Sequence, residues 1–100
     1  MRTLSFDARP LSFTYSALIY DHSTGHAEYM GPIPTDYTKI INFVLEKNID
    51  HIQIYGNTKY TKKIKENLDK ELEKQFSNYS NIPPIKVELK GVIKWNIFVK

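Results

Sequence analysis

The sequence predicts an α/β protein built on one mixed sheet, because its hydrophobic period changes along the chain. Within residues 3–7 and 13–20, apolar and polar side chains alternate, and a two-residue period is typical of β-strands. After Pro34, apolar residues recur every three or four positions, as on the buried face of an amphipathic helix. The 100 residues have the length of one domain, so we expect a single domain over residues 1–100.

The first half is expected to form a meander of three sequential antiparallel strands. These strands cover residues 3–7, 13–20 and 26–30. Residues 21–25 have the composition of a turn and join the second strand to the third. Glycine and proline interrupt regular structure for backbone reasons, and we therefore place a boundary at residues 31–32.

A short helix and a long helix are expected in the second half. The short helix covers residues 37–45, with Thr35 as its cap and Asp36 in its first turn, where a carboxylate suits the helix dipole. Asn48 is expected to end it in a left-handed conformation. The long helix begins at Asn57 or the residue after it and places its apolar side chains at four-residue steps. Those side chains are Tyr60, Ile64, Leu68, Leu72 and Phe76.

Three further strands complete the expected order βββ-α-β-α-ββ. One covers residues 49–55, between the helices, and the other two cover residues 85–89 and 93–99, around a turn at Gly91. Strands that are linked through a helix lie parallel, so the sheet is mixed. The last strand offers an edge through which two copies of the chain can form a homodimer, unless its lysines guard that edge.

Charge, cysteine content and hydropathy exclude several classes of protein. The formal net charge of +3 permits an acidic partner without requiring one. The absence of cysteine excludes disulfides and thiolate metal sites and indicates a reducing compartment. No apolar run approaches the ~18 residues of a membrane span, and the first residues lack the pattern of a signal peptide. We therefore expect a cytoplasmic protein that does not bind membranes.

Three short stretches, taken in order, resemble the ribonuclease H-like superfamily over about residues 3–76. Members of that family begin with a three-stranded meander, a helix, a parallel strand and a second helix. Their first strand ends in a catalytic aspartate, and here a Leu-Ser-Phe-Asp strand ends at Asp7. Their first helix carries a catalytic carboxylate near its start, where this chain has Thr-Asp-Tyr around Asp36. Their fourth strand runs into Gly-Asp-Ser, where this chain has Gly-Asn-Thr around Asn57.

The resemblance implies two-metal hydrolysis of a phosphodiester, in which clustered carboxylates hold two Mg²⁺ or Mn²⁺ ions. Asn57 stands where the family has an aspartate, and the expected C-terminal strands replace a helix that carries the last carboxylate. A neutral amide cannot offset metal charge, so Asp7 and Asp36 remain as the only anionic ligands. We therefore interpret the chain as a ribonuclease H-like fold with a degenerate active site.

Each of these three residues also has a local structural explanation. Asp7 can accept backbone N–H bonds where the first strand turns toward Pro10. Asp36 suits the first turn of a helix, and Asn57 suits a helix cap.

The start of the long helix has an unusual charge pattern. Its first two turns carry four lysines and no acidic residue, whereas acidic residues follow later, which is the order that the helix dipole disfavours. Lysines beside the exposed N–H groups of a helix start attract a phosphate backbone or an acidic protein surface. The alternative is a solvated face with ion pairs such as Lys62–Glu66. The four lysines are Lys59, Lys62, Lys63 and Lys65.

Three functions remain as hypotheses. We favour a non-catalytic module that binds nucleic acid, or a protein that handles nucleic acid, through this basic helix start. The second hypothesis is a divalent-metal nuclease with a reduced site on Asp7 and Asp36, beside Asn57. The third is a small phage or mobile-element accessory protein that binds and inhibits a host protein. A cofactor, Mg²⁺ or Mn²⁺, is expected only under the nuclease hypothesis.

Overall fold

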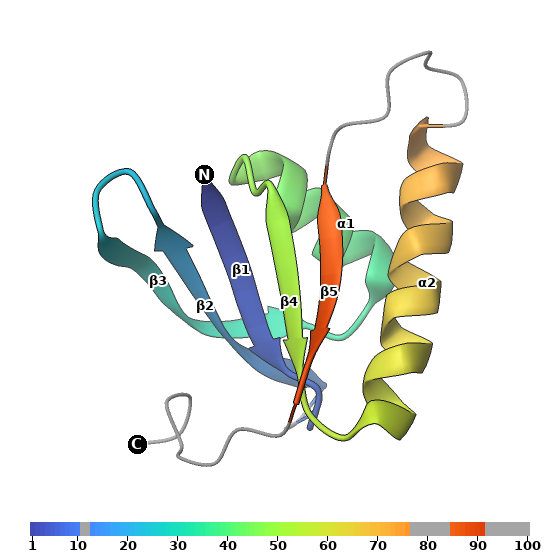
Figure 1. The fold of residues 1–100 in the computed structure, drawn as a ribbon. Coiled ribbons are helices and arrows are strands. Elements are labelled where there is room, and N and C mark those ends of the chain that lie inside the picture. Colours follow the sequence, from blue (N-terminus) through green and yellow to red (C-terminus); the bar gives the residue numbers. More distant parts are fainter. Residues whose placement is uncertain (11–12, 77–84, 92–100) are drawn as a thin grey trace.

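The described residues form five strands that pair into one mixed sheet, and two helices connect strands of this sheet (Figure 1). The computed structural model describes residues 1–10, 13–76 and 85–91. The elements in chain order are β1 (Arg2–Asp7), β2 (Thr14–Asp21), β3 (His26–Pro34), α1 (Tyr37–Glu46), β4 (His51–Tyr55), α2 (Thr58–Phe76) and β5 (Lys86–Lys90). Across the sheet the order is β3-β2-β1-β4-β5. The predicted α/β class and mixed sheet are confirmed.

The direction of each strand follows from its connection. β1, β2 and β3 follow one another with no helix among the described residues between them, and they pair antiparallel, as the meander predicts. β4 and β5 follow the helices α1 and α2, and β4 pairs parallel with both β1 and β5. The expected last strand, over residues 93–99, and with it the expected homodimer edge, lies outside the described residues.

One face of the sheet is apolar because the register aligns apolar residues of neighbouring strands. Leu4 of β1 lies opposite Ile19 of β2 and Ile52 of β4, and all three side chains are buried. α1 and α2 contact each other over this face. Their buried side chains include Ile40, Ile41, Val44, Ile64 and Leu68. The hydrophobic core therefore lies between this face and the two helices.

The other face of the sheet is polar, and within the described part of the chain neither helix lies over it. Thr3 and Ser5 of β1 point to this face, because they alternate with the core residues of the same strand. In β4 the corresponding residues are His51, Gln53 and Tyr55. Both Thr3 and Ser5 are nevertheless buried, since each lies between two neighbouring strands.

β3 is longer than the sequence predicts. The expected boundary at residues 31–32 was wrong, because the strand continues through Gly31 and Pro32 to Pro34. Gly31 pairs with Ala17 and Pro32 with Ser16. β3 is at the edge of the sheet, where proline is tolerated because its missing N–H would face solvent.

The two ends of α1 show how local chemistry sets its length. The predicted cap, Thr35, was wrong, because Asp36 is the N-cap rather than a first-turn residue. Asp36 has an extended backbone, and its carboxylate accepts from the Lys39 N–H over 3.0 Å, which satisfies one open donor of the helix start. Asn48 has a φ of 55°, so the predicted left-handed stop is confirmed.

The buried face of α2 differs by one position from the prediction. Ile64, Leu68 and Leu72 are buried as expected, but Thr61 precedes them on this face in place of Tyr60. Residues 61, 64, 68 and 72 follow the three- and four-residue spacing of a helix face, whereas Tyr60 lies about 100° away and is 59% exposed. Tyr60 is therefore available at the surface beside the helix start.

No helix within the described ranges is long and apolar enough to span a membrane.

Candidate functional site

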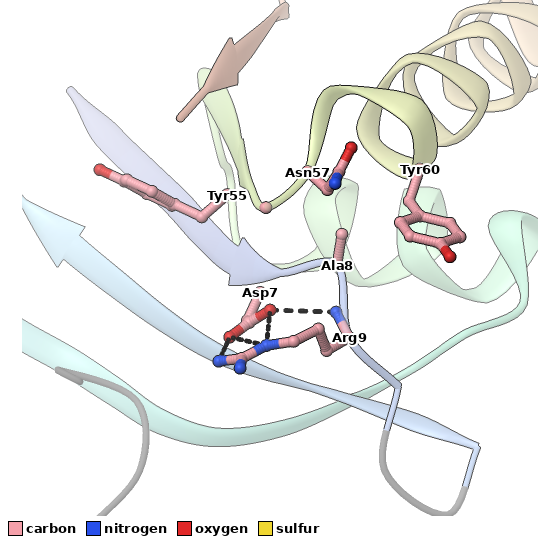
Figure 2. A pocket seen from close by; sticks show the side chains of 7 residues that line it. Asp7, Ala8, Arg9, Tyr55, Asn57 and Tyr60 are labelled. Atoms are coloured by element: carbon pink, nitrogen blue, oxygen red, sulfur yellow. Dashed lines mark hydrogen bonds and ion pairs between the residues drawn. The ribbon is translucent and has the colours of Figure 1, made fainter. Parts of the chain in front are cut away.

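A cavity of about 190 Å³ lies where the carboxyl ends of β1 and β4 meet. Asp7 is opposite Tyr55 in this parallel pair, and the Ala8 N–H donates to the Tyr55 carbonyl over 2.8 Å. α2 begins shortly after β4, so its start reaches the same place. Open α/β sheets bind ligands in crevices at the carboxyl ends of their strands. The lining residues are Asp7, Ala8, Arg9, Tyr55, Gly56, Asn57 and Tyr60 (Figure 2).

Asp7 is a buried carboxylate whose charge is matched by Arg9. The Arg9 Nε lies 3.1 Å from both carboxylate oxygens, and Nη2 donates to Oδ2 over 2.6 Å. The Arg9 backbone N–H donates to Oδ1 over 3.0 Å. The Asp7 side chain is 8% exposed and the Arg9 side chain 71% exposed, and Figure 2 shows the guanidinium folded back onto the carboxylate.

Two opposing effects act on the pKa of Asp7. Burial raises this pKa, because desolvation penalises the charged form, whereas the hydrogen bonds and positive charge of Arg9 lower it. The pKa of Asp7 lies below its ordinary value as a result. The carboxylate is therefore ionised near neutral pH, and its charge is already paired.

Gly56 and Asn57 turn the chain from β4 into α2. Gly56 has a φ of +142°, which only glycine adopts without strain, and a Cβ there would lie 3.1 Å from the Ala8 Cβ. The Asn57 Oδ1 accepts from the Lys59 N–H over 3.0 Å, and the Asn57 carbonyl accepts from the Thr61 N–H over 3.1 Å. Asn57 thus holds the start of α2 as a neutral cap, as its local explanation predicts.

The start of α2 presents positive charge to solvent. Its first turn contains no acidic residue, and Lys59, Lys62 and Lys63 are exposed. Within the described residues these three lysines form no ion pair, and the Lys62–Glu66 pair considered from the sequence is not present there. Lys65 differs, because its Nζ lies 2.7 Å from a carboxylate oxygen of Asp69. We call Lys59, Lys62 and Lys63 together with Tyr60 the basic helix start.

The residues expected to bind metal do not all meet at the cavity. Asp7 and Asn57 line it, but Asp36 caps α1 and is not among the lining residues. Both carboxylate oxygens of Asp7 accept hydrogen bonds from Arg9, so a metal ion would have to displace the guanidinium. Over the described ranges, no group of three or more His, Cys, Asp or Glu residues is arranged to hold a metal ion.

Sequence reasoning missed the roles of Arg9 and Tyr60 among the residues that line this site. Arg9 follows Asp7 by two positions, and this short spacing where the strand ends was the available signal for a side-chain pair. Tyr60 was assigned to the core because it lies four residues before Ile64. Thr61 lies three residues before Ile64 and also fits the spacing of a helix face. The pattern alone therefore did not decide which of Tyr60 and Thr61 is buried.

Comparison with protein-family models and with curated protein sequences finds no match to this chain.

Proposed function

We propose that the protein binds nucleic acid without cleaving it, through the basic helix start and the adjoining cavity, on a ribonuclease H-like scaffold whose active site is degenerate. The observation that carries the proposal is a set of exposed lysines that form no ion pair with any other described residue, around a helix start that has no acidic residue. These lysines are Lys59, Lys62 and Lys63. Such lysines and the open N–H groups of a helix start both attract phosphate.

The aromatic ring beside these lysines favours nucleic acid over a general acidic surface. Tyr60 lies in the first turn of α2, lines the cavity and is 59% exposed. A positive surface tracks the phosphates, and an exposed ring stacks on a base, which is the combination that single-strand binding proteins use. The paired state of Asp7 supports binding rather than hydrolysis, because Arg9 occupies the positions that a metal ion would need.

Charge reversal at the basic helix start tests the proposal. Fluorescence anisotropy with a labelled oligonucleotide, measured at several salt concentrations, should give an affinity that falls as salt rises. The double variant Lys59→Glu, Lys63→Glu should weaken binding and lower the salt dependence, by about one unit of log–log slope for each phosphate that the variant no longer binds. The matched control is Lys70→Glu, which reverses an exposed charge farther along the same helix.

Four results would contradict the proposal. One is binding that does not change with salt, and another is an equal loss of affinity in Lys70→Glu. The third is cleavage of an RNA–DNA hybrid that requires Mg²⁺ or Mn²⁺ and is abolished by Asp7→Ala, because it would show a nuclease. If only a protein partner is captured and no oligonucleotide binds, the nucleic-acid proposal is wrong.

A further inference from the structure

The polar face of the sheet contains a second cavity, of about 370 Å³. It is formed by side chains of β1, β2 and β4 on the face opposite the helices, and it includes Tyr20, His22, His51, Gln53 and Tyr55. Tyr55 also lines the cavity beside α2, so the two cavities share one residue. In Figure 2 the ring of Tyr55 is directed away from Tyr60, which is consistent with its place between the two cavities.

We propose that the nucleic acid is single-stranded and continues from the basic helix start across this sheet face, with bases placed in the second cavity. This inference rests on the proposed function. Beyond the proposed function, the nucleic acid is specified as single-stranded, and the polar face of the sheet is its second contact surface.

The rings at the second cavity can stack on unpaired bases. Tyr20 is 37% exposed, and its ring packs edge-on to His22, with ring centres 4.9 Å apart and planes at 78°. An edge-on contact leaves the broad face of a ring for another partner. Bases in a duplex already stack on one another, so only an unpaired strand can offer a base face to Tyr20.

The hydrogen-bonding groups of this cavity suit bases better than an apolar protein segment. The Gln53 Oε1 accepts from Ser5 Oγ over 3.1 Å and from the Tyr55 hydroxyl over 3.3 Å. His51 Nε2 is buried and lies 3.2 Å from Glu88 Oε1, but it makes no hydrogen bond of good geometry. Base edges carry donors and acceptors that match such a surface.

The charges along β5 match a phosphate backbone next to these groups. Lys86 lies opposite His51 and Lys90 lies opposite Tyr55. A lysine of β5 is therefore paired with the residue at each end of β4. Glu88 lies between them, and its carboxylate is 3.6 Å from Lys90 and 3.2 Å from His51. Positive neighbours thus flank the one acidic residue described on β5.

A comparison of single and double strands tests the inference. Anisotropy should show that a labelled single strand of about ten nucleotides, within the usual site size, binds more tightly than a duplex of the same sequence. Tyr20→Ala should weaken single-strand binding by about 5- to 150-fold, the range for loss of one stacked base. Tyr20→Phe keeps the ring and should retain the affinity. Thermal unfolding of both variants establishes that they are folded.

The outcomes separate this inference from the proposed function. If single strand and duplex bind equally and Tyr20→Ala binds normally, while Lys59→Glu, Lys63→Glu is weakened, the inference is overturned and the proposed function stands. If neither form binds, both are overturned. If light scattering shows a dimer that Tyr20→Ala dissociates, a second copy of the chain occupies this face and the inference is wrong.

Discussion

At the scale of single residues, the pair formed by Asp7 and Arg9 has the strongest chemical consequences. Asp7 ends a central strand and is buried, so its ionised form depends on compensation from a neighbour. Arg9 supplies that compensation from two positions along the chain, through its side chain and its backbone N–H. A carboxylate at a strand end, which resembles a metal ligand in the sequence, is therefore a partner in an ion pair in the folded chain.

Removal of the Arg9 side chain should change how stability depends on pH. With Arg9 present, the pKa of Asp7 is lower in the folded state, so the stabilisation is complete above the unfolded pKa, near 3.8, and is lost as pH falls through the folded pKa. In Arg9→Ala the buried carboxylate keeps the bond from the backbone N–H of residue 9 but loses the guanidinium that matches its charge, so the free energy of unfolding at pH 7 should fall. Urea denaturation at pH 7 and at pH 3 measures the loss and its pH dependence.

The two pH values distinguish the pair from general packing. The difference between the wild-type protein and Arg9→Ala should shrink at pH 3, where protonation of Asp7 removes the unpaired charge. In an Asp7→Asn background, the Arg9→Ala substitution should lower the free energy of unfolding at pH 7 much less than it does in the wild-type protein. A difference that is equal at both pH values, or that persists when Asp7→Asn is already present, would assign the effect to the packing of the Arg9 side chain.

At the scale of elements, the turn between β4 and α2 decides where the basic helix start lies. Gly56 allows the chain to change direction directly after the last paired residue of β4, and Asn57 then caps α2. The turn packs against Ala8, at the end of β1. The cavity, the ion pair of Asp7 and the lysines of α2 are therefore brought together by a single glycine-dependent connection.

Gly56→Ala should destabilise the protein and weaken the proposed binding of nucleic acid. The new methyl group would meet Ala8 at 3.1 Å, and the backbone would keep a φ that side chains disfavour, at a cost of about 1–3 kcal/mol. Gly91→Ala is the matched control, because a Cβ at that position meets no atom of the described part of the chain within 4 Å. Thermal unfolding and anisotropy measure the two effects, and equal behaviour of the two variants would contradict this account of the turn.

At the scale of the whole molecule, the two faces of the sheet differ in polarity and in burial. One face is buried under α1 and α2 and holds the core, including the fully buried Leu4, Phe6 and Ile54. The other carries polar residues that bond to one another across β1, β4 and β5, as Ser5, Gln53 and Glu88 do. Stability is therefore expected to depend mainly on the first face, which leaves the second face available for binding.

Two adjacent residues of β4 test this division. Ile54→Ala removes a fully buried side chain and should lower the free energy of unfolding by about 2–5 kcal/mol. Gln53→Ala removes hydrogen bonds on the polar face, where water in the open cavity can replace them. It should cost less, about 0.5–1.5 kcal/mol for each bond that water does not replace. Urea denaturation compares the two variants under one condition. Equal losses of stability would show that the polar face contributes as much to the stability of the protein as the apolar face does.

Local patterns in the sequence were sufficient for the class and order of the described elements. The two-residue period of β1 and β2, the amphipathic period of α1 and the stop at Asn48 depend on residues within a few positions of one another. The length of β3 was mispredicted because the tolerance of Pro32 depends on its place at the sheet edge. An edge position is a property of the assembled sheet, so no local pattern reports it.

The sequence by itself determined that this is an α/β chain with a mixed sheet and a lysine-rich start to its long helix, because hydrophobic period and charge order are local properties. Only the tertiary structure decided that Asp7 is paired with Arg9, that Tyr60 faces outward and that Tyr55 belongs to two cavities. These facts depend on strand register and on the rotation of a helix about its axis. Both are settled when distant segments pack together, since packing selects among arrangements that local spacing leaves nearly equivalent.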